Sequence, residues 1–335
     1  MNSCKFNEKE YLISNPDVAI AVKNGNFSSG KEHYEIYGRH EGRSLSMALT
    51  NLDRKSKVMH GLKAEGLGLE VGPSHSPIAA KRDGYNVDIL DRLDQNQLRR
   101  KFAAHINNRI NVNNIEFVDH VWQGQSLTEL IGKIDYYDWI IASHVIEHIP
   151  NIINFLQECE RLLKKDGRLS LVIPDKRYCF DALKPCSVTG EILDAFQLNR
   201  KRPSAGQIFE HYANSCKING NSTWSADLEG DLKLINKFQK AYKLYRKSIV
   251  TDDYIDVHCW RFTPDSFRLL MVDLRMLRLI NFEITHEFPT VGCEFYVTLG
   301  KSENEISTID IESDRLNLLK NINGGFKKEV KHPLD

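Results

Sequence analysis

The sequence lacks any Cys-x-x-Cys pair. Its seven cysteines are scattered along 335 residues, at Cys4, Cys159, Cys179, Cys186, Cys216, Cys259 and Cys293. An odd number of isolated cysteines is typical neither of a disulfide framework nor of a cysteine zinc site. We therefore expect a fold held together by a hydrophobic core, which a chain of this length can build.

An excess of charge and a long apolar run are also missing. The 45 basic residues balance the 45 acidic ones, so no overall field would attract nucleic acid or an anionic membrane. No apolar run reaches the length of about 18 residues that a membrane-spanning helix needs. The first residues, Met-Asn-Ser-Cys-Lys-Phe-Asn-Glu, lack the pattern of a signal peptide. We predict a cytoplasmic protein with no nucleic-acid partner and no membrane span.

Short apolar runs alternate with helical patterns along the middle of the chain. The runs are apolar throughout, which is typical of strands buried on both faces of a parallel sheet. We expect strands at residues 67–71, 85–90, 115–118, 139–142 and 168–173. The connecting helices are expected at residues 76–82, 94–104 and 152–163, with Gly167 ending the last of them.

A different arrangement is predicted for the last two strands. Thr263-Pro264-Asp265 opens an amphipathic helix that runs to about Ile280, and strands follow at residues 281–288 and 292–299. Only Pro289 to Val291 separate these strands, whereas a parallel crossover needs about a dozen residues. The sequence therefore predicts a seven-stranded, mostly parallel sheet that ends in an antiparallel strand.

Three other segments flank or interrupt this pattern. Residues 1–50 predict a small helical module, since Asn15-Pro16-Asp17 can start a helix and Gly25 can stop it. Residues 181–257 lack strand signals and predict a helical insertion over the active site. Residues 232–246 within it predict a basic amphipathic helix, which could contact an acidic polysaccharide, a lipid-linked substrate or, peripherally, a membrane surface, or be solvated. The main domain would span residues 51–301, and residues 302–335 predict a polar, partly disordered tail.

The clearest functional signal is the turn after the first predicted strand. Glu70 lies near the end of the strand, and Gly72 lies in the turn, a layout typical of a nucleotide-type cofactor site at the carboxyl edge of a sheet. A dinucleotide site would have three glycines after the strand, as Gly-x-Gly-x-x-Gly, but only Gly72 is placed there. Asp91 ends the second predicted strand, where its two oxygens can accept two ribose hydroxyls.

Several motifs follow one another over residues 62–301. They are Glu70-Val-Gly72, Asp91, Asp138-Trp-Ile-Ile-Ala-Ser-His144-Val-Ile-Glu147-His148-Ile-Pro150, Leu162-Leu-Lys-Lys-Asp-Gly167 and Pro174-Asp175. In this order they resemble the class I S-adenosylmethionine-dependent methyltransferases. Two further motifs, Pro174-Asp-Lys-Arg-Tyr-Cys-Phe-Asp181 and Phe262-Thr-Pro-Asp-Ser-Phe267, resemble a bacterial subfamily whose members often sit among polysaccharide-assembly enzymes.

The resemblance implies a Rossmann-like fold with S-adenosylmethionine as the cofactor. It implies that Glu70 lies near the methionine portion of the cofactor, and that Asp119 accepts a hydrogen bond from the adenine. The other cofactor-binding residues it implies are Val71, Gly72, Pro73, Ser74, Asp91, Ser143 and His144. Ser74 and Ser76 depart from the family pattern, which often has glycines there.

Methyl transfer is an in-line displacement at carbon. The enzyme positions the lone pair of the acceptor and, for a hydroxyl acceptor, removes its proton. Our candidate catalytic residues are His144 and His258 as the base and Asp175, with Tyr178, as substrate-positioning groups, although each of them could instead be structural. The resemblance implies transfer to oxygen of a carbohydrate or glycan precursor in surface polysaccharide biosynthesis.

Three other functions remain open. The sheet would suit a nicotinamide-dependent oxidoreductase, which the glycine spacing disfavours, or a non-catalytic glycan-binding protein on a degenerate methyltransferase fold. The segment from His144 to His148 also matches the His-x-x-Glu-His motif of inverted zinc proteases. That segment directly follows a strand, and no third ligand is evident. We therefore predict no metal site.

Overall fold

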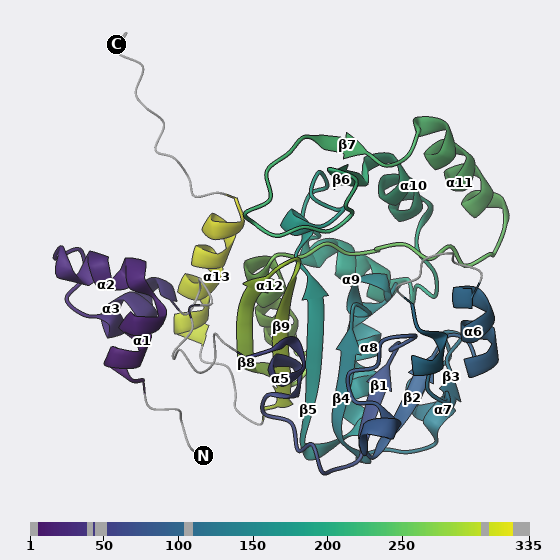
Figure 1. Cartoon of the computed structure of the whole chain (residues 1–335), viewed down its shortest axis with the longest axis horizontal. Coiled ribbons are helices and arrows are strands. Elements are labelled where there is room, and N and C mark those ends of the chain that lie inside the picture. Colours follow the sequence, from purple (N-terminus) through teal and green to yellow (C-terminus); the bar gives the residue numbers. More distant parts are fainter. Residues whose placement is uncertain (1–5, 39–42, 44–51, 104–109, 303–307, 324–335) are drawn as a thin grey trace, which may run out of the picture.

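The structure is a computed structural model of the full chain. It describes all residues except 1–5, 39–42, 44–51, 104–109, 303–307 and 324–335. A seven-stranded sheet forms its centre, and the segment that carries β6, β7, α10 and α11 lies beyond one end of the strands (Figure 1). The small N-terminal helices lie to the side of the sheet in this view.

The sheet has the order β3-β2-β1-β4-β5-β9-β8. The five strands from β1 to β5 are parallel, and β9 pairs antiparallel with both β5 and β8, so the predicted fold class is confirmed. The strands are β1 (Gly68–Val71), β2 (Val87–Asp91), β3 (His120–Val121), β4 (Tyr137–Ser143), β5 (Leu163–Pro174), β8 (Phe282–Val291) and β9 (Glu294–Lys301). The chain moves outward from β1 to β3 and then returns to β4. Ligands bind at such a reversal, beyond the carboxyl ends of the strands.

Two hydrophobic cores cover the two faces of this sheet. Successive residues of a strand point to opposite faces, so Ile140 belongs to one core and Ile141 to the other. Helices α7, α8, α9 and α12 contribute to the first core, and α5 and α6 contribute to the second. Burial on both faces explains why the strand sequences are apolar throughout.

The helices of the main domain are short to medium in length. They are α5 (Arg54–Met59), α6 (Gln95–Ala103), α7 (Leu127–Ile131), α8 (Ile152–Leu162), α9 (Thr189–Gln197), α10 (Ala205–Asn214), α11 (Phe238–Val250) and α12 (Pro264–Met276). The N-terminal helices are α1 (Glu8–Ser14), α2 (Pro16–Lys23), α3 (Gly30–His33) and the π-helix η1 (Tyr34–Gly38). No helix among these or elsewhere in the described residues has the length and apolarity needed to cross a bilayer.

Three local predictions in the main domain were wrong. Residues 76–82 form no helix beyond the single turn η2 (Lys81–Asp83), because the backbone N–H groups of Ile78 and Ala79 bind the carboxylate of Glu70. The third strand is β3 and not residues 115–118, of which Ile115 and Val118 are core residues outside the ladder. Helix α8 ends before Gly167, and β5 begins directly at Leu163.

The flanking segments also differ from the expectation. The insertion contains a two-stranded ribbon of β6 (Cys216–Ile218) and β7 (Leu232–Leu234), so the helix predicted for residues 232–246 is replaced by β7 followed by α11. Within the predicted tail, α13 (Thr308–Ile322) packs on α12. The guanidinium of Arg315 binds Asp273 at 2.7 Å, and Leu318 is buried. The rest of that predicted tail, residues 303–307 and 324–335, lies outside the described residues.

Candidate functional site

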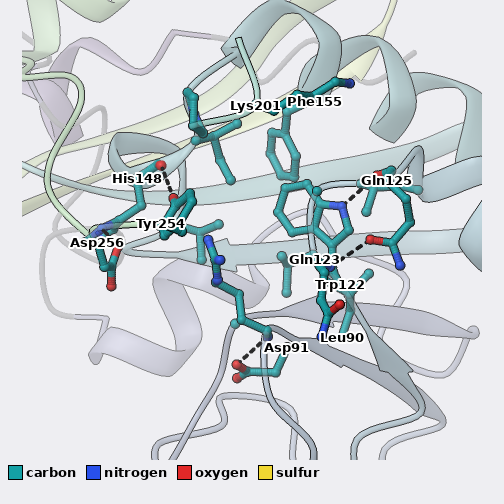
Figure 2. Close-up of a pocket in the computed structure, with 18 of the residues that line it drawn as sticks. Leu90, Asp91, Trp122, Gln123, Gln125, His148, Phe155, Lys201, Tyr254 and Asp256 are labelled. Carbon is teal, nitrogen blue, oxygen red and sulfur yellow. Dashed lines mark hydrogen bonds and ion pairs between the residues drawn. The ribbon is translucent and has the colours of Figure 1, made fainter. Parts of the chain in front are cut away.

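A cavity of about 570 Å³ opens at the carboxyl ends of β1, β2 and β4, where the order of the sheet reverses. Figure 2 shows Leu90 and Asp91 on one side of it, Trp122 and Phe155 along a second wall, and Tyr254 and its neighbours opposite. Of the residues predicted to bind a cofactor, the cavity is lined by Val71, Gly72, Ser74, Asp91 and His144. The site predicted at this edge of the sheet therefore coincides with a cavity.

The turn after β1 is shaped by backbone geometry. Gly72 has a φ of +66°, and a Cβ at this position would lie 2.9 Å from the Val145 side chain. Ser74 is also left-handed, with a φ of +52°, and its N–H donates to the Asp91 carboxylate at 3.1 Å. The second oxygen of that carboxylate accepts the N–H of Arg92 at 2.7 Å. Asp91 is thereby fixed at the cavity, and its oxygens keep lone pairs for further donors.

Glu70 lies behind this turn and not in the cavity. It is 1% exposed, and its oxygens accept the N–H groups of Ile78 at 2.7 Å and Ala79 at 3.0 Å. Burial raises the pKa of the Glu70 carboxyl to about 7, although the two backbone hydrogen bonds oppose that shift. In this arrangement Glu70 holds the loop that follows the turn.

A second network surrounds His144, which follows β4 with a φ of +53°. The Nε2 of His144 lies 2.7 Å from the Glu294 carboxylate on β9. The same carboxylate accepts from the guanidinium of Arg54 at 2.7 Å and from the hydroxyl of Tyr296 at 2.7 Å, and Arg54 also donates to the hydroxyl of Ser143. Sequence reasoning missed Arg54 and Glu294, because both lie far along the chain from the motifs and outside them.

The charge on Glu294 is stabilised by this network. Burial raises the pKa of the Glu294 carboxyl, but the hydrogen bonds from His144 and Arg54 outweigh burial and lower it to about 2. A carboxyl whose pKa is lowered on folding stabilises the fold above its unfolded pKa and loses that contribution as the pH falls through the folded value.

We expect Glu294→Gln to lower the free energy of unfolding at neutral pH by about 2 kcal/mol. The difference from the parent protein should shrink between pH 4.5 and pH 2, because the parent carboxyl is protonated there. Urea unfolding at a series of pH values measures it. Glu283→Gln is the control, since Glu283 on β8 makes only a 3.7 Å ion pair with Arg275. A constant difference across this pH range would contradict the prediction.

The remaining predicted site residues lie outside the cavity. Asp119 binds the ammonium of Lys81 and the N–H of Ile89. Ser143 accepts from Arg54, and Pro73 precedes the described turn at Ser74 without lining the cavity. Asp175 is fully buried and binds Arg177 and the hydroxyl of Thr290.

His258 is buried behind the cavity wall and not in its lining. Its exposed fraction is 7%, and its Nδ1 lies 2.6 Å from the Asp181 carboxylate. Its ring packs edge-on against the ring of His148, which does line the cavity. The structure therefore brings His258 close to the His144–His148 segment without exposing it to the cavity.

The far end of the cavity carries residues that the motifs did not indicate. The guanidinium of Arg92 lies 3.5 Å from the centroid of the Tyr254 ring, and the Tyr254 hydroxyl donates to the backbone carbonyl of His148. Three other cations line the cavity, namely Lys101, Arg200 and Lys201. Arg200, Lys201 and Tyr254 come from the insertion, whose contacts with the main domain no local pattern could predict.

Comparison with known proteins decides the family. A family model described as a methyltransferase domain matches residues 61–273, which is more than half of the chain. The chain belongs to this methyltransferase family. The bovine (Bos taurus) mitochondrial ubiquinone biosynthesis O-methyltransferase is 27% identical over 125 residues. The aligned part spans 36% of this methyltransferase and 30% of the bovine protein.

Two solved structures resemble the chain at low similarity. The 1,6-didemethyltoxoflavin-N1-methyltransferase of Burkholderia thailandensis, with bound 1,6-didemethyltoxoflavin and S-adenosylhomocysteine, is 12% identical with a TM-score of 0.33. That match covers 86% of this chain and 91% of that chain. A protein from Pyrococcus horikoshii OT3 is 13% identical with a TM-score of 0.38. This second match covers 81% of this chain and 99% of the Pyrococcus chain.

The cofactor of the methyltransferase is S-adenosylmethionine. The cavity fits it: Asp91 offers carboxylate oxygens suited to ribose hydroxyls, and Gly72 leaves its backbone open to close approach. The rings of Trp122 and Phe155, whose centroids lie 6.3 Å apart, supply an apolar wall suited to the adenine. When bound, the cofactor supplies an electrophilic methyl group.

We expect Gly72→Ala to weaken both the fold and cofactor binding. A Cβ forces a left-handed residue into strain of about 1 kcal/mol or more, and Val145 has to move to admit it. Urea unfolding and calorimetric titration with S-adenosylmethionine measure the two effects. Gly84→Ala is the matched control, since its φ of +89° is equally left-handed and nothing lies within 4 Å of the added atom. Equal losses of cofactor affinity in both variants would contradict a role of Gly72 at the site.

Proposed function

We propose that this methyltransferase transfers a methyl group from S-adenosylmethionine to a hydroxyl oxygen of a sugar or glycan precursor in surface polysaccharide biosynthesis. The observation that carries the proposal is the far end of the cavity, where the stacked Arg92 and Tyr254 stand with Arg200 and Lys201. An aromatic ring offers a stacking face to a sugar, and guanidinium and ammonium groups bind phosphate or carboxylate. This end therefore suits a hydroxyl-rich acceptor that carries an anionic group.

Transfer to oxygen is supported by the bovine relative, which is named an O-methyltransferase. We assign His144 as the base. Because the Glu294 carboxylate can only accept, the Nε2 of a neutral His144 carries the proton, and Nδ1 keeps a lone pair. His144 lines the cavity and can take up the proton of an acceptor hydroxyl there. His258 and Asp175, which are buried outside the cavity, would act through other residues.

Isotope-labelled methyl transfer tests the proposal. The purified protein is incubated with methyl-labelled S-adenosylmethionine and a panel of nucleotide sugars, sugar phosphates, acidic oligosaccharides and catechols, and the products are analysed by mass spectrometry. We expect label on a sugar hydroxyl. We also expect His144→Asn to lower kcat by about 100-fold or more while cofactor binding is kept.

Each of the other outcomes points to a different function. Methylation of catechols alone would overturn the carbohydrate acceptor. It would favour an aromatic hydroxyl as the acceptor instead. Tight cofactor binding without turnover on any acceptor would favour a non-catalytic glycan-binding protein. Binding of a reduced nicotinamide without binding of S-adenosylmethionine would favour an oxidoreductase.

A further inference from the structure

Three ligand-type side chains converge beside the cavity. The Oε1 atom of Glu147 lies 3.9 Å from the Nε2 of His148 and 3.9 Å from the Nε2 of His258. One such atom from each residue lies within 4.8 Å of the other two. We propose that Glu147, His148 and His258 form a binding site for a divalent transition-metal ion, with zinc as the best match.

Both histidines are oriented by a carboxylate on the opposite side of the ring. The Nδ1 of His148 lies 2.9 Å from Asp256, and the Nδ1 of His258 lies 2.6 Å from Asp181. A carboxylate accepts the Nδ1 proton, so the Nε2 of a neutral ring keeps its lone pair for a metal. Metal-binding histidines in proteins commonly donate their second ring N–H to a carboxylate in this way.

The carboxylate of Glu147 has no hydrogen bond that would explain its burial, although the Nδ1 of His144 lies 3.7 Å from its Oε1. Its exposed fraction is 1%, and within the described part of the chain neither oxygen has a hydrogen-bond partner. A buried carboxylate without hydrogen bonds is costly, and a cation is one of the few groups that can compensate it. The nearby charge of Asp181 is already balanced by Lys184, whose ammonium lies 2.5 Å away. Among the buried carboxylates of this cluster, Glu147 is therefore the one without a hydrogen bond in the described part of the chain.

Backbone contacts hold the two segments of the site together. The carbonyl oxygen of Glu147 accepts the N–H groups of Cys259 at 2.7 Å and Trp260 at 3.2 Å, and the Trp260 indole donates to the carbonyl of Ile149 at 2.6 Å. The three donor atoms thus converge before any ion binds. Two donors on a tetrahedral zinc at about 2.1 Å each lie about 3.4 Å apart. The two 3.9 Å pairs therefore have to close by about half an ångström, and the two histidine nitrogens, which lie within 4.8 Å of each other, by up to about 1.4 Å.

The donor set selects the kind of ion. Two imidazole nitrogens and one carboxylate oxygen suit zinc and its neighbours among the transition metals, whereas magnesium and calcium prefer oxygen ligands. The same set in zinc enzymes leaves a fourth position open. His148 also lines the cavity, so the site belongs to the cavity wall. The sequence argument against a metal depended on a missing third ligand to His144 and His148. In the fold, His258 joins His148, and Glu147 takes the place of His144.

Metal analysis of the full chain tests this site apart from methyl transfer. The protein, freed of any affinity tag, is loaded with zinc, dialysed and analysed by mass spectrometry for metals, and the chelator-stripped protein is titrated with zinc. We expect about one zinc per chain and saturable rebinding. Cobalt substitution should give the visible absorption of a tetrahedral site.

Three variants locate the ion. Glu147→Gln should weaken zinc binding by about 100-fold or more, and Asp256→Asn, at a largely exposed carboxylate, by about 10-fold or more. His60→Gln, at a histidine that packs against His286 and Phe288 far from the cluster, should bind zinc like the parent. If Glu147→Gln does not fold, Asp256→Asn decides the matter, since an exposed Asp-to-Asn change keeps the shape.

Two results would overturn the proposal: the absence of stoichiometric zinc after loading, or parent-like zinc affinity in Asp256→Asn. Titration with S-adenosylmethionine on the same samples separates this outcome from the proposed function. Cofactor binding without zinc refutes the metal site alone, and zinc binding without cofactor binding refutes the methyltransferase activity alone.

Discussion

Asp91→Ala should lower the affinity for S-adenosylmethionine by about 100-fold or more. Hydrogen bonds to a charged group contribute about 1.5–3 kcal/mol each, and the Asp91 oxygens face the position where two ribose hydroxyls would be accepted. The substitution also releases the N–H of Ser74, which ties the turn after β1 to the end of β2. Calorimetric titration with the cofactor measures the loss.

A conservative variant and a control variant are needed to interpret the affinity of Asp91→Ala. Asp91→Asn keeps the size of the side chain and one acceptor oxygen, so its affinity should lie between those of Ala and the parent. Asp83→Ala removes a half-exposed carboxylate that makes only a 3.4 Å ion pair with Lys55, and it should leave binding unchanged. Parent-like affinity in Asp91→Ala would refute the placement of the cofactor at this strand end.

Lys184→Met should lower the free energy of unfolding by about 3 kcal/mol or more. Lys184 and Asp181 are both almost fully buried, and the ammonium contacts the carboxylate at 2.5 Å and the Ser215 hydroxyl at 3.3 Å. The substitution leaves the Asp181 charge in a buried site with His258 and the weakly donating thiol of Cys179 beside it. Urea unfolding monitored by circular dichroism measures the effect.

The double variant Asp181→Asn/Lys184→Met is the control for this prediction. It removes both charges, so it should recover part of the stability that Lys184→Met loses. Arg161→Met is the matched surface control, because Arg161 is 62% exposed and its ion pair with Glu158 is screened by water. A loss below about 1 kcal/mol in Lys184→Met would show that the buried pair is not a main support of the insertion.

The sequence predicted the sheet well because burial on both faces leaves a plain apolar pattern. The antiparallel end of the sheet was also predictable, since the link from Pro289 to Val291 is too short for a parallel crossover. The third strand was misplaced because β3 is only two residues long, and the apolar residues before it reach the core without joining the ladder. A periodic pattern reports burial, and burial alone does not distinguish a strand from a packed loop.

The site was predicted only where its residues follow strands in the chain. Gly72, Asp91 and His144 lie at strand ends, and all three line the cavity. Glu294 and His258 contact the segment that follows β4, although both lie far from it in the sequence. Such partners leave no local spacing to detect. Glu70 belongs to a motif, but its carboxylate stabilises a loop by accepting the backbone N–H groups of Ile78 and Ala79.

The centre of the sheet contains one further contact with a consequence for how related sequences can vary. A Cβ on Gly68 in β1 would lie 2.1 Å from the ring of Trp139 in β4, the strand with which it pairs. Both positions are buried where they meet, so neither can enlarge by itself. Among homologues, any residue larger than glycine at position 68 should therefore occur together with a smaller side chain at position 139. The two positions would evolve as a pair.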